Sequence, residues 1–277
     1  SALWLKSQGF EVDIAPVDEK GFVDVKALAS LIRSDTILVS VMAVNNEIGS
    51  IQPIQAISEL LADKPTISFH VDAVQALAKI PTEKYLTNRV DFATFSSHKF
   101  HGVRGVGFVY IKSGKKITPL LTGGGQERDY RSTTENVAGI AATAKALRLA
   151  MEKLDIFTSK TGQMKAVIRQ ALLDYPDIFV FSDEKGFAPH ILTFGIKGVR
   201  GEVIVHAFED YDIFISTTSA CSSKAGKPAG TLIAMGVDKD KAQSSVRLSL
   251  DLENDMSQVE QFLTKLKLIY NQTRKVR

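Results

Sequence analysis

Residues Phe92–Tyr110 read FATFSSHKFHGVRGVGFVY, and the organisation of the rest of the chain can be worked out from them. An apolar run typical of a buried strand comes first, a Ser-Ser-His-Lys cluster follows, and a glycine-containing loop leads into a second apolar run. Lys99 comes just after the first run, where burial favours a neutral, nucleophilic amine over a charged ammonium. Such a lysine suits a Schiff base with an aldehyde cofactor. An ordinary surface lysine is the simpler interpretation. The other motifs of the chain must therefore show whether Lys99 binds a cofactor.

The sequence around this stretch alternates short β-rich runs with amphipathic helices. We expect strands at Phe10–Pro16, Thr36–Ala43, Ile67–Val71, Val90–Phe95 and Gly107–Tyr110, the second of them buried on both faces, and helices after Asp24 and Pro53. This alternation predicts an α/β domain with a mainly parallel sheet. Ligands bind at the carboxyl ends of parallel strands. Asn46, Asp72 and Lys99 each come just after one of these runs.

The pattern changes in the second half of the chain. Long helical segments at residues 137–154 and 161–173 come first. Strands are then expected at Ile178–Phe181, His190–Phe194, Ile213–Ile215 and Val246–Leu250, before a last helix at residues 255–270. This predicts a smaller α+β domain. We therefore divide the chain into a large domain of residues 1–155 and a small domain of residues 156–277.

Composition narrows the class of protein. The chain has 277 residues, of which 44% are hydrophobic and 23% charged, as expected of a globular protein with a substantial core. A net charge of +3 with dispersed basic residues does not favour nucleic-acid binding. The longest apolar run, Ile37–Val44, is too short to span a membrane. The single cysteine, Cys221, excludes an internal disulfide and a cysteine-rich metal site, so we expect a cytoplasmic protein that binds no metal.

Several side chains can carry chemistry, and each also has a simpler interpretation. Asp72 could pair with a protonated ring nitrogen, although Asp is equally suited to capping a helix at Ala73–Ala78. Arg247 could clamp a carboxylate or pack its stem in a strand. Cys221 lies among small and polar residues near two lysines, which favours a reactive thiolate over a buried thiol. Ser96, Ser97 and His98 could bind a phosphate or form a polar turn.

Together these motifs resemble the cysteine desulfurases of the class V aminotransferases, which are pyridoxal phosphate enzymes of fold type I. The resemblance covers nearly the whole chain and rests on motifs in matching order. They are Val44–Gly49 (VNNEIG), His70–Gln75 (HVDAVQ), Ser96–Lys99 (SSHK), Gly123–Arg128 (GGGQER) with Arg131–Thr134 (RSTT), Ser219–Cys221 (SAC) and Val246–Leu250 (VRLSL).

The resemblance implies a role for each matching residue. Lys99 is expected to bind pyridoxal 5′-phosphate covalently and to move the substrate's α-proton. Asp72 would keep the ring nitrogen protonated, Gln75 would contact the ring's phenolic oxygen, and Asn46 would lie near the ring. Ser96, Ser97 and His98 would bind the phosphate, with Thr134 reaching it from the neighbouring subunit of a homodimer. Arg247 would orient the carboxylate of L-cysteine, and Cys221 would take its sulfur as a persulfide for an acceptor protein, leaving L-alanine.

Two features of the chain depart from the family pattern. Family members carry a preceding segment with the main phosphate-binding loop and a histidine that stacks on the ring, so we expect this chain to be truncated at its N-terminus and, taken alone, to bind pyridoxal phosphate weakly or not at all. Thr133 replaces the glycine usual before the phosphate-contacting threonine. Two alternatives therefore stay open. One is a related pyridoxal phosphate enzyme, such as a selenocysteine lyase or an aminotransferase. The other is an inactive fragment that serves only in dimerisation.

Overall fold

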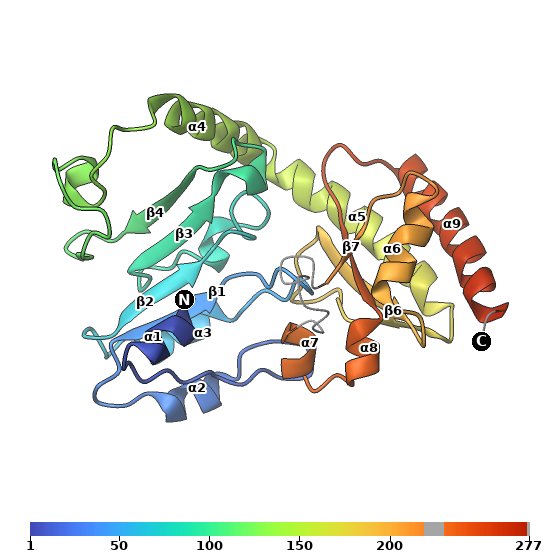
Figure 1. The fold of residues 1–277 in the computed structure, drawn as a ribbon, viewed down its shortest axis with the longest axis horizontal. Coiled ribbons are helices and arrows are strands. Elements are labelled where there is room, and N and C mark those ends of the chain that lie inside the picture. The colour runs from blue at the N-terminus through green and yellow to red at the C-terminus, as the bar shows by residue number, and fades with distance from the viewer. Residues whose placement is uncertain (219–229, 276–277) are drawn as a thin grey trace.

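The computed structural model describes residues 1–218 and 230–275, which form two sheets joined by a long helical segment (Figure 1). The first sheet has the order β1-β2-β3-β4. Strands β1, β2 and β3 are parallel, and β4 is antiparallel to β3. The predicted α/β fold with a mainly parallel sheet is confirmed. The bounds are β1 (Leu38–Met42), β2 (Ser68–Asp72), β3 (Phe92–Ser96) and β4 (Gly107–Ile111).

The helices of this half begin and end where local chemistry predicts. Asp24 accepts hydrogen bonds from the amides of Lys26 and Ala27 and so caps α2 (Val25–Leu31). Helix α3 (Ile54–Leu60) follows Pro53, and α1 (Ala2–Ser7) precedes Gly9, whose φ is +93°. A short 3₁₀ turn, η1 (Thr82–Lys84), lies between β2 and β3. The core of this half includes strand residues Val39, Phe69, Val71, Ala93 and Phe95.

Two expectations for the first half are wrong. Residues 10–16 form no strand, and the pairing nearest to them is an isolated bridge between Val17 and Val23. Alternating polarity alone does not make a strand here, because no strand among the described residues pairs with this segment to complete its hydrogen bonds. Strand β1 is not buried on both faces either, since Leu38 and Met42 are 47% and 40% exposed.

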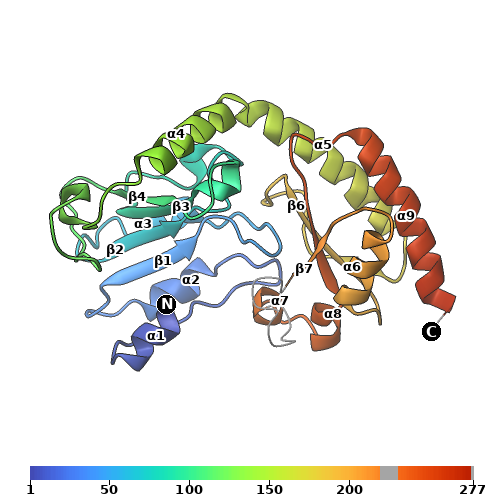
Figure 2. The same ribbon diagram turned by 45° about the horizontal axis from the view of Figure 1, so that its top comes forward.

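A nearly continuous pair of helices connects the two sheets. Helix α4 (Val137–Glu152) and helix α5 (Leu154–Leu173) meet at Lys153, whose φ of −107° interrupts the helical backbone. Figure 2 shows the pair passing over the top of the molecule from the first sheet to the second. The segment before α4 contains a 3₁₀ turn, η3 (Glu127–Asp129).

The second sheet has the order β5-β6-β8-β7, and all of its neighbouring strands are antiparallel. Its core is built with α5, α6 and α9. The expected strand at Ile213–Ile215 is wrong in position, because pairing with β8 begins only at Ser216. The bounds are β5 (Ile178–Val180), β6 (Ile191–Ile196), α6 (Gly201–Glu209), β7 (Ser216–Thr217), α7 (Gly230–Ala234), α8 (Lys239–Gln243), β8 (Ser245–Ser249) and α9 (Met256–Lys275).

We propose that the chain divides into domains at residues 155/156, near the start of α5. Two separate hydrophobic cores support this division, one around each sheet. A third, smaller cluster lies where the halves meet and joins residues from both. It consists of Ile48, Phe187, Leu232, Met235 and Ala242.

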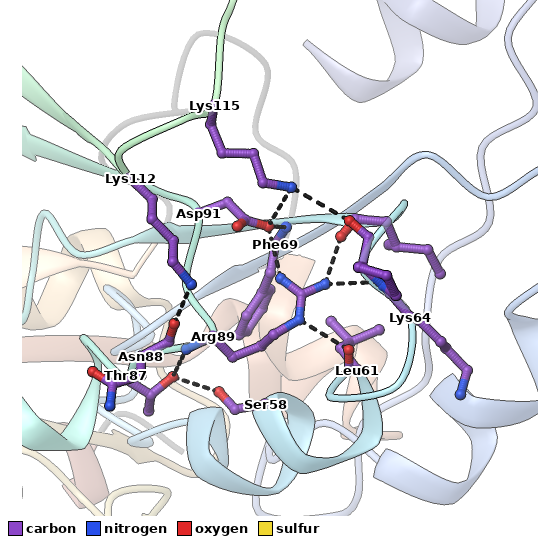
Figure 3. A network of polar contacts seen from close by, with 12 residues as sticks. Ser58, Leu61, Lys64, Phe69, Thr87, Asn88, Arg89, Asp91, Lys112 and Lys115 are labelled. Atoms are coloured by element: carbon purple, nitrogen blue, oxygen red, sulfur yellow. Dashed lines mark hydrogen bonds and ion pairs between the residues drawn. The ribbon is translucent and has the colours of Figure 1, made fainter.

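A buried ion pair fixes the amino end of the first sheet (Figure 3). Asp91, 2% exposed, accepts hydrogen bonds from Arg89 at 2.7 Å and from the amide of Phe69 at 2.9 Å. Burial raises the pKa of Asp91, but these donors and Lys115 outweigh it and hold the pKa below its ordinary value. Arg89 also donates to three backbone carbonyls, those of Leu61, Lys64 and Ile67. This network lies at the amino end of the sheet, and the candidate site lies at the opposite, carboxyl end.

Candidate active site

The carboxyl ends of β1, β2 and β3 lie side by side. Asp72 pairs with Met42 of β1 on one side and with Thr94 of β3 on the other. The amide of Ala43 donates to the Asp72 carbonyl at 2.7 Å, so the sheet pairing extends to the last residue of β2. The connections that follow these strands, with Asn46, Gln75 and Lys99, therefore leave from one edge of the sheet. This is the arrangement expected from the sequence.

Asp72 is the last residue of β2 and is half-buried. One carboxylate oxygen accepts a 3.0 Å hydrogen bond from the amide of Val74, as in an Asx turn. Residues 74–79 form turns instead of the helix considered at Ala73–Ala78. On the same face, His70 contacts the hydroxyls of Ser40 and Thr94 at 2.7 and 3.1 Å. Burial lowers the pKa of His70, against the opposing effect of Asp72, which favours a neutral ring.

Lys99 lies in a short 3₁₀ turn, η2 (Ser97–Phe100), directly after β3. Phe100 anchors the turn and is 1% exposed, whereas Lys99 is half-buried and hydrogen-bonds to no other residue that the structure describes. The Ser97 hydroxyl is buried and 2.9 Å from the hydroxyl of Thr143 on α4. A Cβ at Gly102 would lie 1.9 Å from the Ser97 oxygen, so only glycine fits there. The turn is thus tightly packed, whereas the amine of Lys99 keeps no hydrogen-bond partner among the described residues.

The loop after β1 connects the two halves of the molecule. Asn45, 6% exposed, accepts from the amides of Glu47 and Ile48 and donates to Thr231 at 3.1 Å. The half-buried Asn46 exposes its carbonyl to Arg247, whose Nη1 donates to it at 2.8 Å. Arg247 comes from β8, where it pairs with Thr193 and Ser216. The structure thus brings together Asn46 and Arg247, both predicted site residues.

The remaining predicted residues lie in three places. Ser96 ends β3 and is half-buried, Gln75 is half-buried in the turn after Asp72, and His98 is exposed beside Lys99. Thr134 is exposed in the segment after β4. Because Ile111 at the end of β4 pairs with Phe92 at the start of β3, this segment leaves from the opposite end of the sheet. Cys221 lies outside the described residues.

A group of basic side chains near Lys99 was not found from the sequence. His190 is 5% exposed, its ring nitrogens have no hydrogen-bond partner among the described residues, and its ring is 5.7 Å from that of Phe157. Burial, followed by the charges of Lys79, Lys165, Arg247 and Lys99, lowers the pKa of His190 to about 3. Burial likewise lowers the pKa of Lys79, with Lys99 contributing. Lys79 and His190 each stand as a single basic residue among apolar neighbours, in LAKI and PHIL, and no local motif marks them as site residues.

Two further features were looked for in the described residues: a metal site and a membrane-spanning helix. Within residues 1–218 and 230–275, no group of three or more His, Cys, Asp or Glu side chains is arranged to hold a metal ion. None of the helices described is long and apolar enough to cross a membrane.

The fold is that of a class of protein, the NifS-like pyridoxal phosphate enzymes of fold type I, as two solved structures show. A solved NifS-like protein superimposes with a TM-score of 0.87 at 36% identity, covering 98% of this chain and 70% of that one. A NifS-like protein from Rickettsia africae gives a TM-score of 0.84 at 28% identity, with 96% of this chain and 72% of that chain covered.

The chain belongs to the aminotransferase class-V family, whose model matches residues 2–262. It is 49% identical to a NifS/IcsS protein homolog of Lactobacillus delbrueckii subsp. bulgaricus, over 98% of this chain and 71% of that protein. It is 39% identical to the cysteine desulfurase IscS of Clostridium botulinum, over 100% of this chain and 70% of that protein. The resemblance inferred from the motifs is confirmed, and the chain spans about 70% of the length of these relatives.

Proposed function

We propose that the protein is a pyridoxal phosphate-dependent cysteine desulfurase, which converts L-cysteine to L-alanine and takes the sulfur as a persulfide on Cys221. One observation carries the proposal: Arg247 of the second sheet reaches Asn46 at the edge of the first sheet that Asp72 and Lys99 share. The names of the relatives support it and favour a desulfurase over a selenocysteine lyase, an aminotransferase or an inactive dimerisation fragment.

The residues at this edge fit pyridoxal 5′-phosphate. Asp72 commits one carboxylate oxygen to the amide of Val74, and its other oxygen bonds to no residue that the structure describes. A half-buried carboxylate of this kind is stabilised by a cationic donor, which a protonated pyridine nitrogen provides. Lys99 supplies a half-buried amine on the neighbouring strand connection. When bound, the cofactor supplies an aldehyde and an electron sink.

We assign the other residues at this edge to holding the cofactor and moving a proton. Lys99 Nζ would bond covalently to the aldehyde carbon and later carry the proton of the substrate α-carbon. Gln75 would donate to the ring oxygen. Ser96 and His98 would donate to the phosphate. Ser97 belongs to the same predicted set, although its hydroxyl contacts Thr143 in this structure.

We assign the binding and attack of the substrate to Arg247 and Cys221, with Asn46 near both the ring and the substrate. The guanidinium of Arg247 would bind the carboxylate of L-cysteine, because its planar fork matches two carboxylate oxygens. The Cys221 thiolate would attack the substrate sulfur. The sulfur–carbon bond then breaks, the carbon takes up a proton, and L-alanine leaves while Cys221 keeps the sulfur atom. No outside oxidant is needed, because the carbon keeps the electron pair of the broken sulfur–carbon bond and is reduced as the sulfur–sulfur bond forms.

We further propose a cytoplasmic homodimer that delivers sulfur to an acceptor protein, as in iron–sulfur cluster assembly. The exposure of Thr134 on a segment away from its own site supports a role toward a neighbouring subunit. The name IscS of the relatives supports the assembly role. The single cysteine of the chain supports a reducing compartment.

Sulfide and alanine release tests the proposed function. With L-cysteine, pyridoxal 5′-phosphate and a reductant, the protein should produce alanine and sulfide in equal amounts. Cys221→Ala and Lys99→Ala should each abolish sulfide release, and Cys221→Ala should still bind the cofactor. Sulfide release that persists in Cys221→Ala would reject the assigned mechanism. Transamination of a keto acid without sulfide would favour an aminotransferase.

A further inference from the structure

A five-residue stretch, Arg247–Asp251, contacts the connection that follows each of the three parallel strands. After β1, the carbonyl of Asn46 accepts from Arg247 at 2.8 Å. After β2, Lys79 Nζ lies 3.6 Å from Asp251 Oδ2. After β3, His101 Nε2 lies 3.0 Å from the same oxygen. Both ends of this stretch are therefore attached to the edge where the candidate site lies.

The residues that follow Asp251 in the chain restrain it. Its Oδ1 accepts from the amide of Leu252 at 2.6 Å, and its amide donates to Asn254 Oδ1 at 2.8 Å. The other oxygen is thus directed at Lys79 and His101. Because an ionised carboxylate only accepts hydrogen bonds, the proton of this contact is on His101 Nε2.

The contact with Lys79 is the more sheltered of the two. The Lys79 side chain is only 10% exposed, against 63% for His101, and its ammonium lies 4.2 Å from the centre of the Phe157 ring. Burial lowers the pKa of Lys79, Asp251 raises it, and the nearby charge of Lys99 lowers it. Loss of Asp251 would leave a nearly buried cation beside Lys99 with its carboxylate partner removed.

The contact with His101 acts directly on the turn that carries Lys99. His101 follows η2 by one residue and has a left-handed backbone, with φ +64°, which is costly for a residue with a Cβ. Its side-chain hydrogen bond to Asp251 ties this residue to the segment that follows β8. It therefore also restrains Lys99, two residues earlier.

We propose that Asp251 is a positioning residue, which sets where Lys99 lies relative to Arg247 by attaching the η2 turn and Lys79 to the end of β8. This inference rests on the proposed function for the roles of Lys99 and Arg247. The structural link itself can be tested without any reaction.

Hydrogen exchange and steady-state kinetics of Asp251→Ala test the proposal. In the protein without added cofactor, amide exchange in residues 97–102 should become at least fivefold faster. With cofactor, the KM for L-cysteine should rise at least fivefold, because Lys99 and Arg247 are no longer held in fixed positions relative to each other. Asp251→Asn should give an intermediate effect, since it keeps an acceptor for His101 but loses the charge that faces Lys79.

The matched control is Asp183→Ala. Asp183 also joins the two halves, through Lys20 at 2.8 Å, and it lies 3.1 Å from Arg169 of its own half; its 35% exposure is close to the 32% of Asp251. This variant should change neither the exchange of residues 97–102 nor KM. Equal effects of Asp251→Ala and Asp183→Ala would overturn the proposal.

A second variant covers the case in which Asp251→Ala does not fold. His101→Ala removes only the contact with the η2 turn and should also speed exchange in residues 97–102; unchanged exchange would overturn the proposal. The two claims fail separately. Absence of sulfide release from the unaltered protein rejects the proposed function, whereas normal release with control-like behaviour of Asp251→Ala rejects the positioning role alone.

Discussion

Arg247 and Asn46 are 201 positions apart in the chain, yet Arg247 Nη1 donates a 2.8 Å hydrogen bond to the Asn46 carbonyl. This contact joins the second sheet to the loop after β1. It sets the place of the guanidinium relative to the edge that holds Asp72 and Lys99. The candidate site is therefore a property of both halves of the molecule and not of either sheet alone.

Replacing Arg247 with lysine should weaken substrate binding selectively. Lysine keeps the charge but lacks the planar fork that binds two carboxylate oxygens. A charge-assisted hydrogen bond contributes about 1.5–3 kcal/mol, so KM for L-cysteine should rise about tenfold to a hundredfold. Steady-state kinetics measure this, with Arg169→Lys as the control away from the site. An unchanged KM would show that Arg247 does not bind the substrate.

Replacing Arg89 with alanine should destabilise the first half strongly. The change removes one donor of the buried Asp91, which keeps the Phe69 amide and Lys115, and the side-chain donor of three backbone carbonyls. Removing one partner of a buried pair costs about 3–5 kcal/mol. Urea unfolding should report this loss, whereas Arg148→Ala, whose partner Glu152 is 53% exposed, should change stability by less than about 1 kcal/mol. Similar losses in both variants would contradict the role given to this network.

His190 should make stability depend on pH in the acidic range. Its pKa falls from 6.5 in the unfolded chain to about 3 in the folded protein. The unfolded state therefore binds one more proton between these values, and stability present above pH 6.5 declines as the pH falls toward 3. The decline approaches about 1.4 kcal/mol per pH unit.

Comparison with His190→Phe isolates this contribution. The difference in unfolding free energy between the two proteins should change by roughly 1–2 kcal/mol from pH 7 to pH 5, with the unaltered protein losing more. Parallel stability curves over this range would mean that His190 does not stay neutral in the folded protein.

Replacing Gly102 with alanine should disturb the turn that carries Lys99. The new Cβ would meet the Ser97 hydroxyl at 1.9 Å and its carbonyl at 3.0 Å. Overpacking of this kind costs about 1–3 kcal/mol. Thermal unfolding should show the loss, and borohydride trapping should show less pyridoxal 5′-phosphate bound to Lys99. Adding Ser97→Gly to the variant removes the clashing hydroxyl and should recover part of the thermal stability, which a general folding defect would not allow.

The sequence predicted the elements of this fold better than the contacts between them. The Asp24 cap, the amphipathic helices and the strand-end positions of Asp72 and Lys99 follow from local patterns. The failure at Phe10–Pro16 has the opposite cause, because a strand needs a partner that local alternation does not reveal. The exposed residues Leu38 and Met42 show the same limit, since an apolar run does not say which face is covered.

The site was predicted where a motif marks it and missed where only tertiary structure does. Asn46 and Arg247 were found by their motifs, but their hydrogen bond spans 201 positions and leaves no local pattern. Asp251 is one of several acids before α9, and nothing in that stretch distinguishes it. The role proposed for Asp251 depends on its contacts with Lys79 and His101, which lie in the connections after two other strands.

The sulfur atom itself provides the most direct test of the proposed function. The protein is incubated with pyridoxal 5′-phosphate and L-cysteine, without reductant, and the peptide that contains Cys221 is weighed by mass spectrometry. We predict a mass increase of one sulfur atom on Cys221, formed together with alanine and absent in Lys99→Ala. An unmodified Cys221 in a protein that has produced alanine and sulfide would contradict the account.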